Sequence, residues 1–174
     1  MLESGRDAEL ARRAAGSERE ALRRLYEQYS DELFAVAHRL TDSAADARDV
    51  LHDVFSGLPT SLQTFDYEQP VGPWLRAVTS RAALMLLRTR ARRCEVSIPR
   101  DDVACSRSAG VLDSIALERA LASLPDRLRT VLILKEIEGY SHKEIGKLLN
   151  IDPSASAVRL FRARERLRAL LGER

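Results

Sequence analysis

Three arginines near the end of this sequence are well suited to bind a charged ligand. Arg159, Arg162 and Arg166 follow one another at intervals of three and four residues, which places them on one face of a helix. Guanidinium groups bind phosphates, and a guanidinium can also bind the edge of a guanine through two hydrogen bonds. The spacing therefore predicts a surface that binds nucleic acid.

The residues before these arginines carry the start and stop signals of two successive helices. Ser141 and Glu144 have the spacing of a capping box, in which each side chain binds a free amide at the helix start. Asn150 suits a left-handed turn, and the pair Asp152 and Pro153 suits the start of a further helix. A short helix, a three-residue turn and a long arginine-rich helix are typical of a helix-turn-helix.

The outward face of the last helix predicts which side chains meet DNA, while positions 160, 163, 167 and 170 are expected to face the core. In a helix-turn-helix, the first turns of the second helix meet base edges, and other positions meet phosphates. Arg159 suits a two-pronged contact with guanine, whereas Ala155 and Val158 suit thymine methyl groups. An ordinary solvated helix surface is the competing interpretation. The predicted contacts in this half are His142, Lys143, Ser154, Ala155, Val158, Arg159, Arg162 and Arg166.

A second basic stretch lies in the first half of the chain, directly after several aromatic residues. Phe65, Tyr67 and Trp74 precede the arginine run from Arg76 to Arg93. Single-stranded DNA is held by aromatic faces beside a basic groove, so this stretch is a second candidate site. Trp74 fits a core position equally well. The predicted contacts in this half are Phe65, Tyr67, Trp74, Arg76, Arg81 and Arg88.

Other kinds of site lack the residues that they need. Cys94 and Cys105 are the only cysteines, and with three scattered histidines they cannot supply the paired ligands of a structural zinc site. The sequence holds no glycine-rich phosphate loop, no metal-binding triad and no nucleophile motif. We therefore expect no metal, no cofactor and no enzymatic activity.

Amphipathic helices must position both basic stretches. Apolar residues recur at helical spacing over residues 22–40, 47–58 and 74–93, with Ala8 to Ala15 as a candidate fourth helix. Residues 63–73 lack this period and contain two prolines and a glycine, which predicts a loop. The alternation that would indicate a strand is absent from the sequence, so we expect an all-α fold.

A change in composition divides the chain into two parts. From Cys94 to Leu112 the helical period stops, and serine, glycine and proline become frequent. Beyond it, Pro125 and Asp126 suit the start of a helix that Gly139 would end. The sequence therefore predicts two small helical domains, over residues 1–93 and 113–174, joined by a flexible linker over 94–112.

The overall composition is typical of a folded protein that touches nucleic acid. The chain has 174 residues, 45% of them apolar and 31% charged, with a net charge of +2. Its arginines nevertheless gather in two stretches, which is the charge distribution expected for two contacts with nucleic acid. Because a membrane-length apolar stretch and a secretory signal pattern are both absent from the sequence, we expect a cytoplasmic protein without a membrane partner.

The two halves together resemble the extracytoplasmic-function (ECF) sigma factors, members of the sigma-70 family of bacterial RNA polymerase. The resemblance runs from about Leu22 to Leu171. In the first half, ADARDVLHDVF at Ala45 to Phe55 is similar to the segment that grips the coiled coil of the polymerase β′ clamp. In the second half, LPDRLRTVLILKEIEGYSHKEIGKLLNIDPSASAVRLFRARERLRALL follows the pattern of sigma region 4 without gaps.

The resemblance implies a role in starting transcription. The first half would bind the melted −10 element and the last helix the −35 element, with core polymerase (β′ clamp and β flap), promoter DNA and an anti-sigma factor as partners. The resemblance also implies a polymerase contact that includes Val50, Val54 and Phe55. These three apolar residues lie on the helical stripe expected to form the core, so the aspartates of the contact are the better candidates. The polymerase-binding residues implied by the resemblance are Asp46, Asp49, Val50, Asp53, Val54 and Phe55.

The chain departs from the family pattern at two places. A common tryptophan is replaced by the stretch Ser56 to Pro59, and Ser156 and Ala157 stand where a valine and a lysine are more usual. A helix-turn-helix regulator that acts on duplex DNA without polymerase is the main alternative, although its sensor part would normally be α/β. The other alternative is a sigma factor that a partner protein holds inactive.

Overall fold

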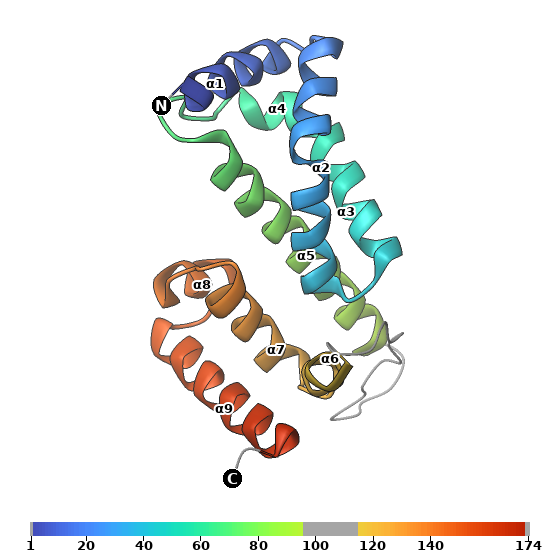
Figure 1. The fold of residues 1–174 in the computed structure, drawn as a ribbon, viewed down its shortest axis with the longest axis vertical. Helices are drawn as coiled ribbons and strands as arrows, with labels where there is room; N and C mark the ends of the chain where they lie inside the picture. Colours follow the sequence, from blue (N-terminus) through green and yellow to red (C-terminus); the bar gives the residue numbers. More distant parts are fainter. Residues whose placement is uncertain (1, 96–114, 173–174) are drawn as a thin grey trace. The chain divides into compact units, whose positions relative to one another are not determined.

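The computed structural model of the chain describes residues 2–95 and 115–172, with side chains for residues 6–90 and 119–172. Its contacts divide the chain into two compact units, residues 1–92 (unit 1) and 93–174 (unit 2). Every element in the described ranges is helical, which confirms the predicted all-α fold (Figure 1). The predicted linker lies outside the described residues, apart from residues 94 and 95, which continue the last helix of unit 1.

Unit 1 consists of four longer helices and one short one. Long helices were predicted at three of these places, and the candidate N-terminal helix is also present. The last helix begins at Val71, so the prediction of a loop as far as Pro73 was wrong. Proline is tolerated in a first helical turn because its missing amide has no partner to lose there. The helices are α1 (Leu2–Ala15), α2 (Arg19–Thr41), α3 (Ala44–Ser56), α4 (Leu58–Leu62) and α5 (Val71–Glu95).

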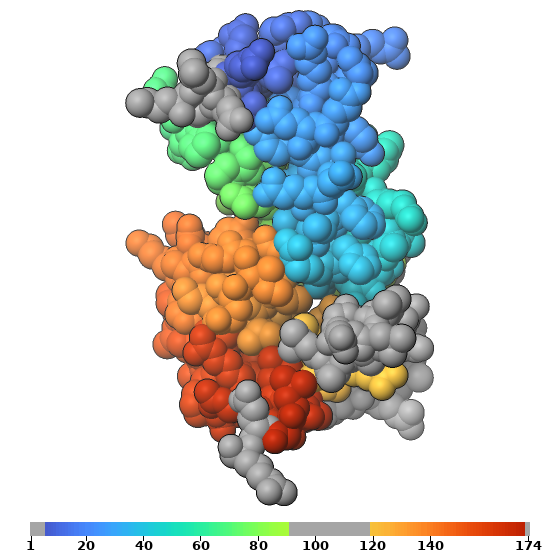
Figure 2. Space-filling model, viewed as in Figure 1, coloured from blue at the N-terminus to red at the C-terminus, as the bar shows by residue number. Residues whose placement is uncertain are grey.

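The core of unit 1 forms around the buried stripe of α2. Leu25 and Leu33 on this stripe are fully buried, as are Leu62 of α4 and Leu75 of α5. Helix α2 packs against α1 and α3, and α1 also packs against α4. Figure 2 shows the side chains of α1 and α2 in direct contact on the face in view. The core therefore fixes both ends of the segment between α4 and α5, where the predicted aromatic site lies.

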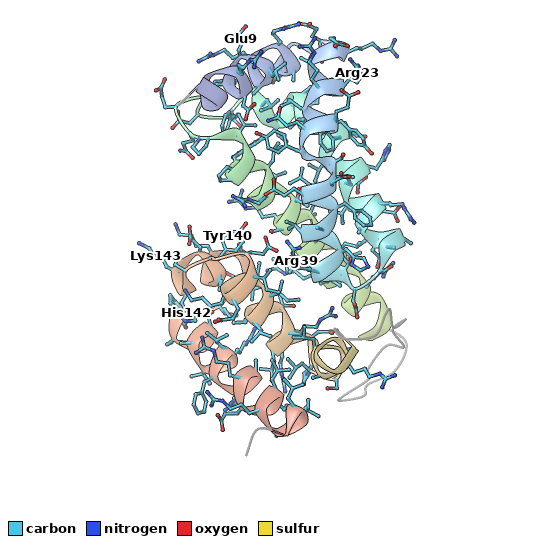
Figure 3. All side chains as sticks on the ribbon, in the orientation of Figure 1. Glu9, Arg23, Arg39, Tyr140, His142 and Lys143 are labelled. Carbon is cyan, nitrogen blue, oxygen red and sulfur yellow. The ribbon has the colours of Figure 1, made fainter. Side chains whose placement is uncertain are left out.

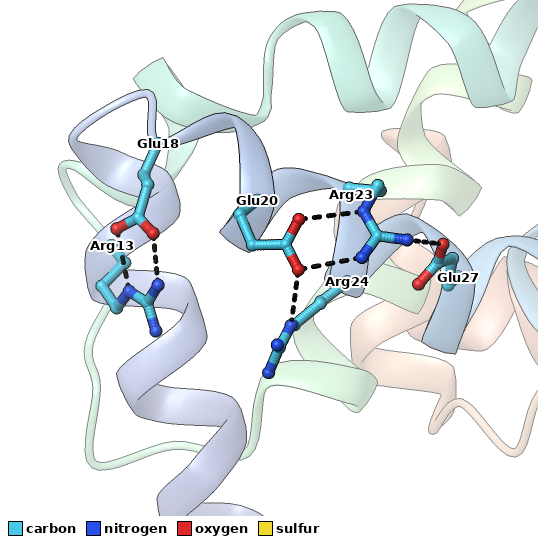
Figure 4. A network of polar contacts seen from close by, with 6 residues as sticks. All are labelled: Arg13, Glu18, Glu20, Arg23, Arg24 and Glu27. Carbon is cyan, nitrogen blue, oxygen red and sulfur yellow. Dashed lines mark hydrogen bonds and ion pairs between the residues drawn. The ribbon is translucent and has the colours of Figure 1, made fainter.

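Charged side chains follow the junction of α1 and α2 (Figure 4). Arg13 pairs with Glu18, while Glu20 accepts hydrogen bonds from both Arg23 and Arg24 at 2.9–3.0 Å. The hydrogen bonds from Arg23, and then from Arg24, lower the pKa of Glu20 to about 2. These pairs are exposed to solvent, so each contributes little to stability.

Unit 2 contains the predicted helix-turn-helix. Before this motif, the sequence predicted one helix that Gly139 would end. In the structure that helix changes into a turn of π-helix before the chain reaches Gly139. Gly139 itself is left-handed with φ 74°, as predicted. Buried residues from several helices, including Leu128, Val131 and Ile145, form its core with Leu160 and Ala163. The elements are α6 (Ile115–Ala122), α7 (Asp126–Leu132), the π-turn (Ile133–Ile137), α8 (His142–Leu149) and α9 (Pro153–Leu171).

The turn between α8 and α9 follows the predicted geometry with one exception. The amide of Ser141 donates to the Glu144 carboxylate at 2.8 Å, and the amide of Glu144 donates to the Ser141 hydroxyl at 3.3 Å, which completes the capping box. Asn150 is left-handed with φ 54°. Asp152 stands at the N-cap of α9 but its side chain makes no capping hydrogen bond there. The predicted N-cap position of Asp152 and the place of Pro153 in the first turn are confirmed, although Asp152 does not cap the helix with its side chain.

Gly146 allows the chain to turn tightly after α8. A Cβ atom at this position would lie 2.7 Å from the carbonyl oxygen of Ile151, closer than real Cβ atoms approach backbone. The group that approaches Gly146 so closely is the turn before α9. Gly146 thus fixes the path by which the chain enters α9.

Candidate nucleic-acid and polymerase interfaces

Helix α9 presents one face to the core and another to solvent. Leu160 and Ala163 are buried, and Leu167 is half-buried. Leu170, in the last turn of α9, is 52% exposed, so its assignment to the core was wrong. The predicted DNA-facing positions lie on the other side. Ser154, Val158, Arg162 and Arg166 are exposed, and Ala155 and Arg159 are half-buried.

The arginines of α9 fall into two groups that differ in their partners. Arg164 binds Glu136 at 2.7 Å, and Arg168 binds Glu165 at the same distance. Arg159, Arg162 and Arg166, which we call the outer arginines, make no ion pair within the part of the chain that the structure describes. The free charges are therefore the ones on the predicted DNA face. An ordinary solvated helix surface would not require the unpaired arginines to lie together on one face and the paired arginines elsewhere.

The start of α8 adds further basic groups beside α9 (Figure 3). Lys143 is exposed, as predicted for a phosphate contact. It lines an open hollow of about 440 Å³ together with Lys147, the turn from Asn150 to Asp152, and Pro153 at the start of α9. Sequence reasoning missed Lys147, although its spacing of four residues from Lys143 signals a shared helix face.

His142 is half-buried and contacts the neighbouring helix directly. Its Nδ1 atom lies 2.9 Å from the hydroxyl oxygen of Ser156, whose side chain is fully buried in α9. Only part of the His142 ring thus remains open to a ligand, whereas it was predicted simply as a phosphate contact. Sequence reasoning also missed Phe161, which is 65% exposed on α9 three residues beyond Val158.

The aromatic residues of unit 1 are packed together more closely than predicted. Phe65 is buried in the core, with its ring 4.7 Å from that of Trp74 and 5.2 Å from that of Tyr67. Its assignment as a base-stacking residue was therefore wrong, because the apolar core covers it. Tyr67 and Trp74 are half-buried. They remain candidates for contact with an unpaired base.

Tyr67 is held in place from two sides. Its hydroxyl donates to the backbone carbonyl of Leu62 at 2.9 Å, and the guanidinium of Arg12 lies 5.0 Å from the centre of its ring. Arg12 comes from α1, far away in the sequence, so sequence reasoning could not place it there. A cation over the ring adds positive charge to the aromatic site.

The basic residues of α5 do not all share one surface. Arg76 binds Glu32 of α2 at 3.1 Å, which compensates its charge. Arg81 and Arg88 are exposed and share a face of the helix with Met85, whose side chain is 68% exposed. The part of this helix best suited to meet DNA therefore lies around Arg81 and Arg88.

The predicted polymerase contact separates into exposed and buried residues along α3. Asp49 and Asp53 are exposed, as a contact requires. Val50 and Val54 are buried, and so is Asp46, so their assignment to the interface was wrong. The valines lie on the core side of α3, while both carboxylate oxygens of Asp46 bind the guanidinium of Arg90.

Phe55, at the end of α3, lies between the core and the surface. It is half-buried and makes an edge contact with Tyr26, with 4.9 Å between the ring centres. Tyr26, on α2, is 47% exposed. The two rings form a small apolar surface where the end of α3 meets α2.

Comparisons with known proteins agree with the geometry of both units. The family described as Sigma-70 region 2 matches residues 25–93, and Sigma-70, region 4 matches residues 114–167. The ECF RNA polymerase sigma factor SigM of Mycobacterium tuberculosis is 30% identical over 95% of this chain and 85% of its own length. The RNA polymerase sigma factor CarQ of Myxococcus xanthus is 31% identical over 88% of this chain and 91% of its own. This protein therefore belongs to the ECF sigma factors of the sigma-70 family.

A solved structure also matches the chain. CnrH, in complex with the cytosolic domain of CnrY, is 27% identical and aligns with a TM-score of 0.59 over 95% of this chain and 97% of its own. The structure of the present protein contains no helix long and apolar enough to cross a membrane, among the residues it describes. In the same ranges, no cluster of potential metal ligands occurs.

Proposed function

We propose that this protein binds core RNA polymerase and directs it to promoters by contacting both the −35 and the −10 element. The separation of the α9 arginines carries the proposal, because the uncompensated charges coincide with the predicted DNA face. Arg159 would contact base edges, and Arg162 and Arg166 would contact phosphates. Sequence recognition would then come from a few residues only, with Ser154, Ala155 and Val158 beside Arg159.

The second DNA contact would lie in unit 1. We infer that Tyr67 and Trp74 hold a base of the melted −10 element, with Arg81 and Arg88 of α5 near the strand. Arg76 is bound to Glu32, so the strand would compete with that carboxylate for it. Binding only the unpaired base would favour the melted state without any hydrolysis. The protein would act as a transcription factor and not as a catalyst.

Polymerase would be held mainly through α3. Asp49 and Asp53 offer exposed carboxylates on α3, and Phe55 with Tyr26 adds an apolar surface at the end of this helix. These groups suit the β′ clamp, while unit 2 would approach the β flap. Such a protein would work in the cytoplasm, where the polymerase acts. The complex of the similar protein CnrH with the cytosolic domain of CnrY makes a protein partner, such as an anti-sigma factor, a further part of the proposal.

Reconstitution with core polymerase tests this function. Transcription from a library of promoter fragments is expected to start at a defined subset only when the protein is added. Binding to duplex DNA without transcription that depends on both protein and core would contradict it, and would favour a regulator that acts without polymerase. The same preparation with Asp49 and Asp53 changed to lysine supplies a control for the polymerase contact.

A further inference from the structure

A buried serine and a half-buried histidine join the two helices of the helix-turn-helix. Ser156 is 0% exposed, and its hydroxyl oxygen lies 2.9 Å from Nδ1 of His142, the first residue of α8. The backbone amide of Ser156 donates to the carbonyl of Asp152 at 3.0 Å, as in any helix. The contact between α8 and α9 at this point is therefore made by the two side chains.

Packing alone does not explain a hydroxyl at this position. An apolar side chain could fill a fully buried site between two helices without the cost of removing a hydroxyl from water. The hydroxyl of Ser156 is compensated here because the imidazole of His142 binds it. A hydrogen bond between the two side chains thus takes the place of a simple apolar contact. Because a hydrogen bond is directional, it fixes the orientation of the imidazole ring.

The chemistry of imidazole links this orientation to its other nitrogen. If the Ser156 hydroxyl donates to Nδ1, the neutral ring carries its proton on Nε2. A protonated ring donates from Nδ1 to the serine oxygen and also carries a proton on Nε2. In both of these states Nε2 is a hydrogen-bond donor, whereas a neutral ring protonated on Nδ1 would donate to the serine oxygen and leave Nε2 as an acceptor. A phosphate at Nε2 favours the two states in which Nε2 carries a proton. Within the described parts of the chain, the ring makes no second hydrogen bond.

The position of the ring is suited to a phosphate contact. His142 precedes the exposed Lys143 in the first turn of α8, at the positive end of the helix dipole, where the Glu144 carboxylate of the capping box also lies. Ser156 is next to Ala155 and one turn before Arg159, both on the predicted DNA face of α9. A backbone phosphate beside α9 would meet the start of α8 at this point.

We propose that Ser156 is a positioning residue for DNA binding: it holds the His142 ring through Nδ1 so that the Nε2 proton is donated to a DNA phosphate. This inference rests on the proposed function of α8 and α9. It extends that function to a buried residue that cannot itself touch DNA. Histidines bound to metals are oriented in the same way, by a hydrogen bond to the nitrogen that does not bind the metal.

A double-mutant cycle on the whole chain tests the proposal. Because phosphate contacts do not depend on sequence, a short fluorescent duplex of arbitrary sequence at low salt is a suitable probe. His142→Ala and Ser156→Ala are each expected to lower the affinity about three- to tenfold, the range expected for one hydrogen bond. The double variant is expected to bind no more weakly than His142→Ala alone, since Ser156 acts through the histidine.

Ser123→Ala is a matched control, because it also removes a serine hydroxyl from unit 2, one that donates to the Ala120 carbonyl at 2.8 Å. It is expected to leave the affinity unchanged. Nitrogen NMR supplies a second readout, since the chain has only three histidines and His38 and His52 serve as references in unit 1. The Nε2 signal of His142 is expected to shift on adding duplex, and to shift less in Ser156→Ala.

The outcomes separate this proposal from the function on which it rests. Normal duplex binding by Ser156→Ala, or losses that multiply in the double variant, would show that Ser156 acts by packing and would overturn the inference. The proposed function would survive that result. A wild-type chain that neither binds the duplex nor supports transcription with core polymerase would overturn both.

Discussion

Asp46 and Arg90, 44 residues apart in the sequence, form a two-pronged ion pair between the start of α3 and the end of α5. The carboxylate is 2% exposed, whereas the guanidinium is 53% exposed. The two partners therefore depend on the pair to different degrees, because water can solvate the arginine but not the aspartate. The pair holds in place the helix that carries Asp49 and Asp53.

Loss of Arg90 is expected to destabilise the protein more than loss of the Asp46 charge. Arg90→Met leaves a buried carboxylate without its partner, which should lower the free energy of unfolding by about 2–4 kcal/mol. Asp46→Asn leaves an arginine that water can reach and should cost about 1 kcal/mol. Urea unfolding measures both. Arg81→Met, an exposed change on the same helix, is the control, and the opposite order of the first two variants would contradict the assigned burial.

Charge reversal on α3 is expected to weaken polymerase binding without unfolding unit 1. Asp49→Lys with Asp53→Lys changes two exposed side chains and should lower the affinity for core polymerase about tenfold or more. Binding of fluorescent protein to core measures the effect. Asp31→Lys with Glu68→Lys reverses two exposed charges elsewhere in unit 1 and should bind normally. Equal losses in both double variants would show a general charge effect and no contact at α3.

Arg159→Ala is expected to change which promoters are used. If its guanidinium binds a guanine, the loss should reduce discrimination at one base pair of the −35 element by about 1–3 kcal/mol. Sequencing of promoters selected by the holoenzyme measures this. Arg164→Ala, which removes an arginine that binds Glu136, should keep the wild-type preference. A preference unchanged in Arg159→Ala would remove this residue from the base contact.

The capping box of α8 gives unit 2 a dependence on pH. Hydrogen bonds from the side chain and then the amide of Ser141 lower the pKa of Glu144 from its ordinary value of 4.5. Because the folded pKa is the lower one, this stabilisation is complete above pH 4.5 and is lost as the pH falls through the lowered value. Wild type should therefore exceed Glu144→Gln in stability at neutral pH, and the gap should close in acid. A gap that persisted in acid would exclude the carboxylate as its cause.

Local signals in the sequence were sufficient to predict the helix-turn-helix. The capping box at Ser141, the left-handed Asn150 and the terminating Gly139 each act within a few residues of chain, so the sequence contains the whole interaction. The outward direction of the outer arginines followed from helical spacing alone. The sequence could not show which arginines find carboxylates, because Arg164 reaches Glu136 from another helix.

Burial was the property that the sequence predicted least well. Asp46 was assigned to an interface by the family resemblance and Phe65 by its place among aromatic residues before a basic stretch. One is instead covered by an ion pair and the other by rings. The partner of Asp46 lies on a distant helix, and the core around Phe65 is formed partly by α1. His142 and Ser156 are likewise 14 residues apart and separated by a turn. The burial of Asp46 and Phe65 and the contact between His142 and Ser156 each depend on tertiary packing.

The most direct test of the central claim compares two double variants of α9. Arg162→Ala with Arg166→Ala removes two outer arginines, while Arg164→Ala with Arg168→Ala removes the same charge from arginines that bind carboxylates. Promoter binding by the reconstituted holoenzyme is measured over a series of salt concentrations. The first variant should bind more weakly, and the slope of the logarithm of its binding constant against the logarithm of the salt concentration should fall in magnitude by about 0.9 for each lost phosphate contact. The second variant should resemble wild type. Equal weakening in both would contradict the assigned DNA face.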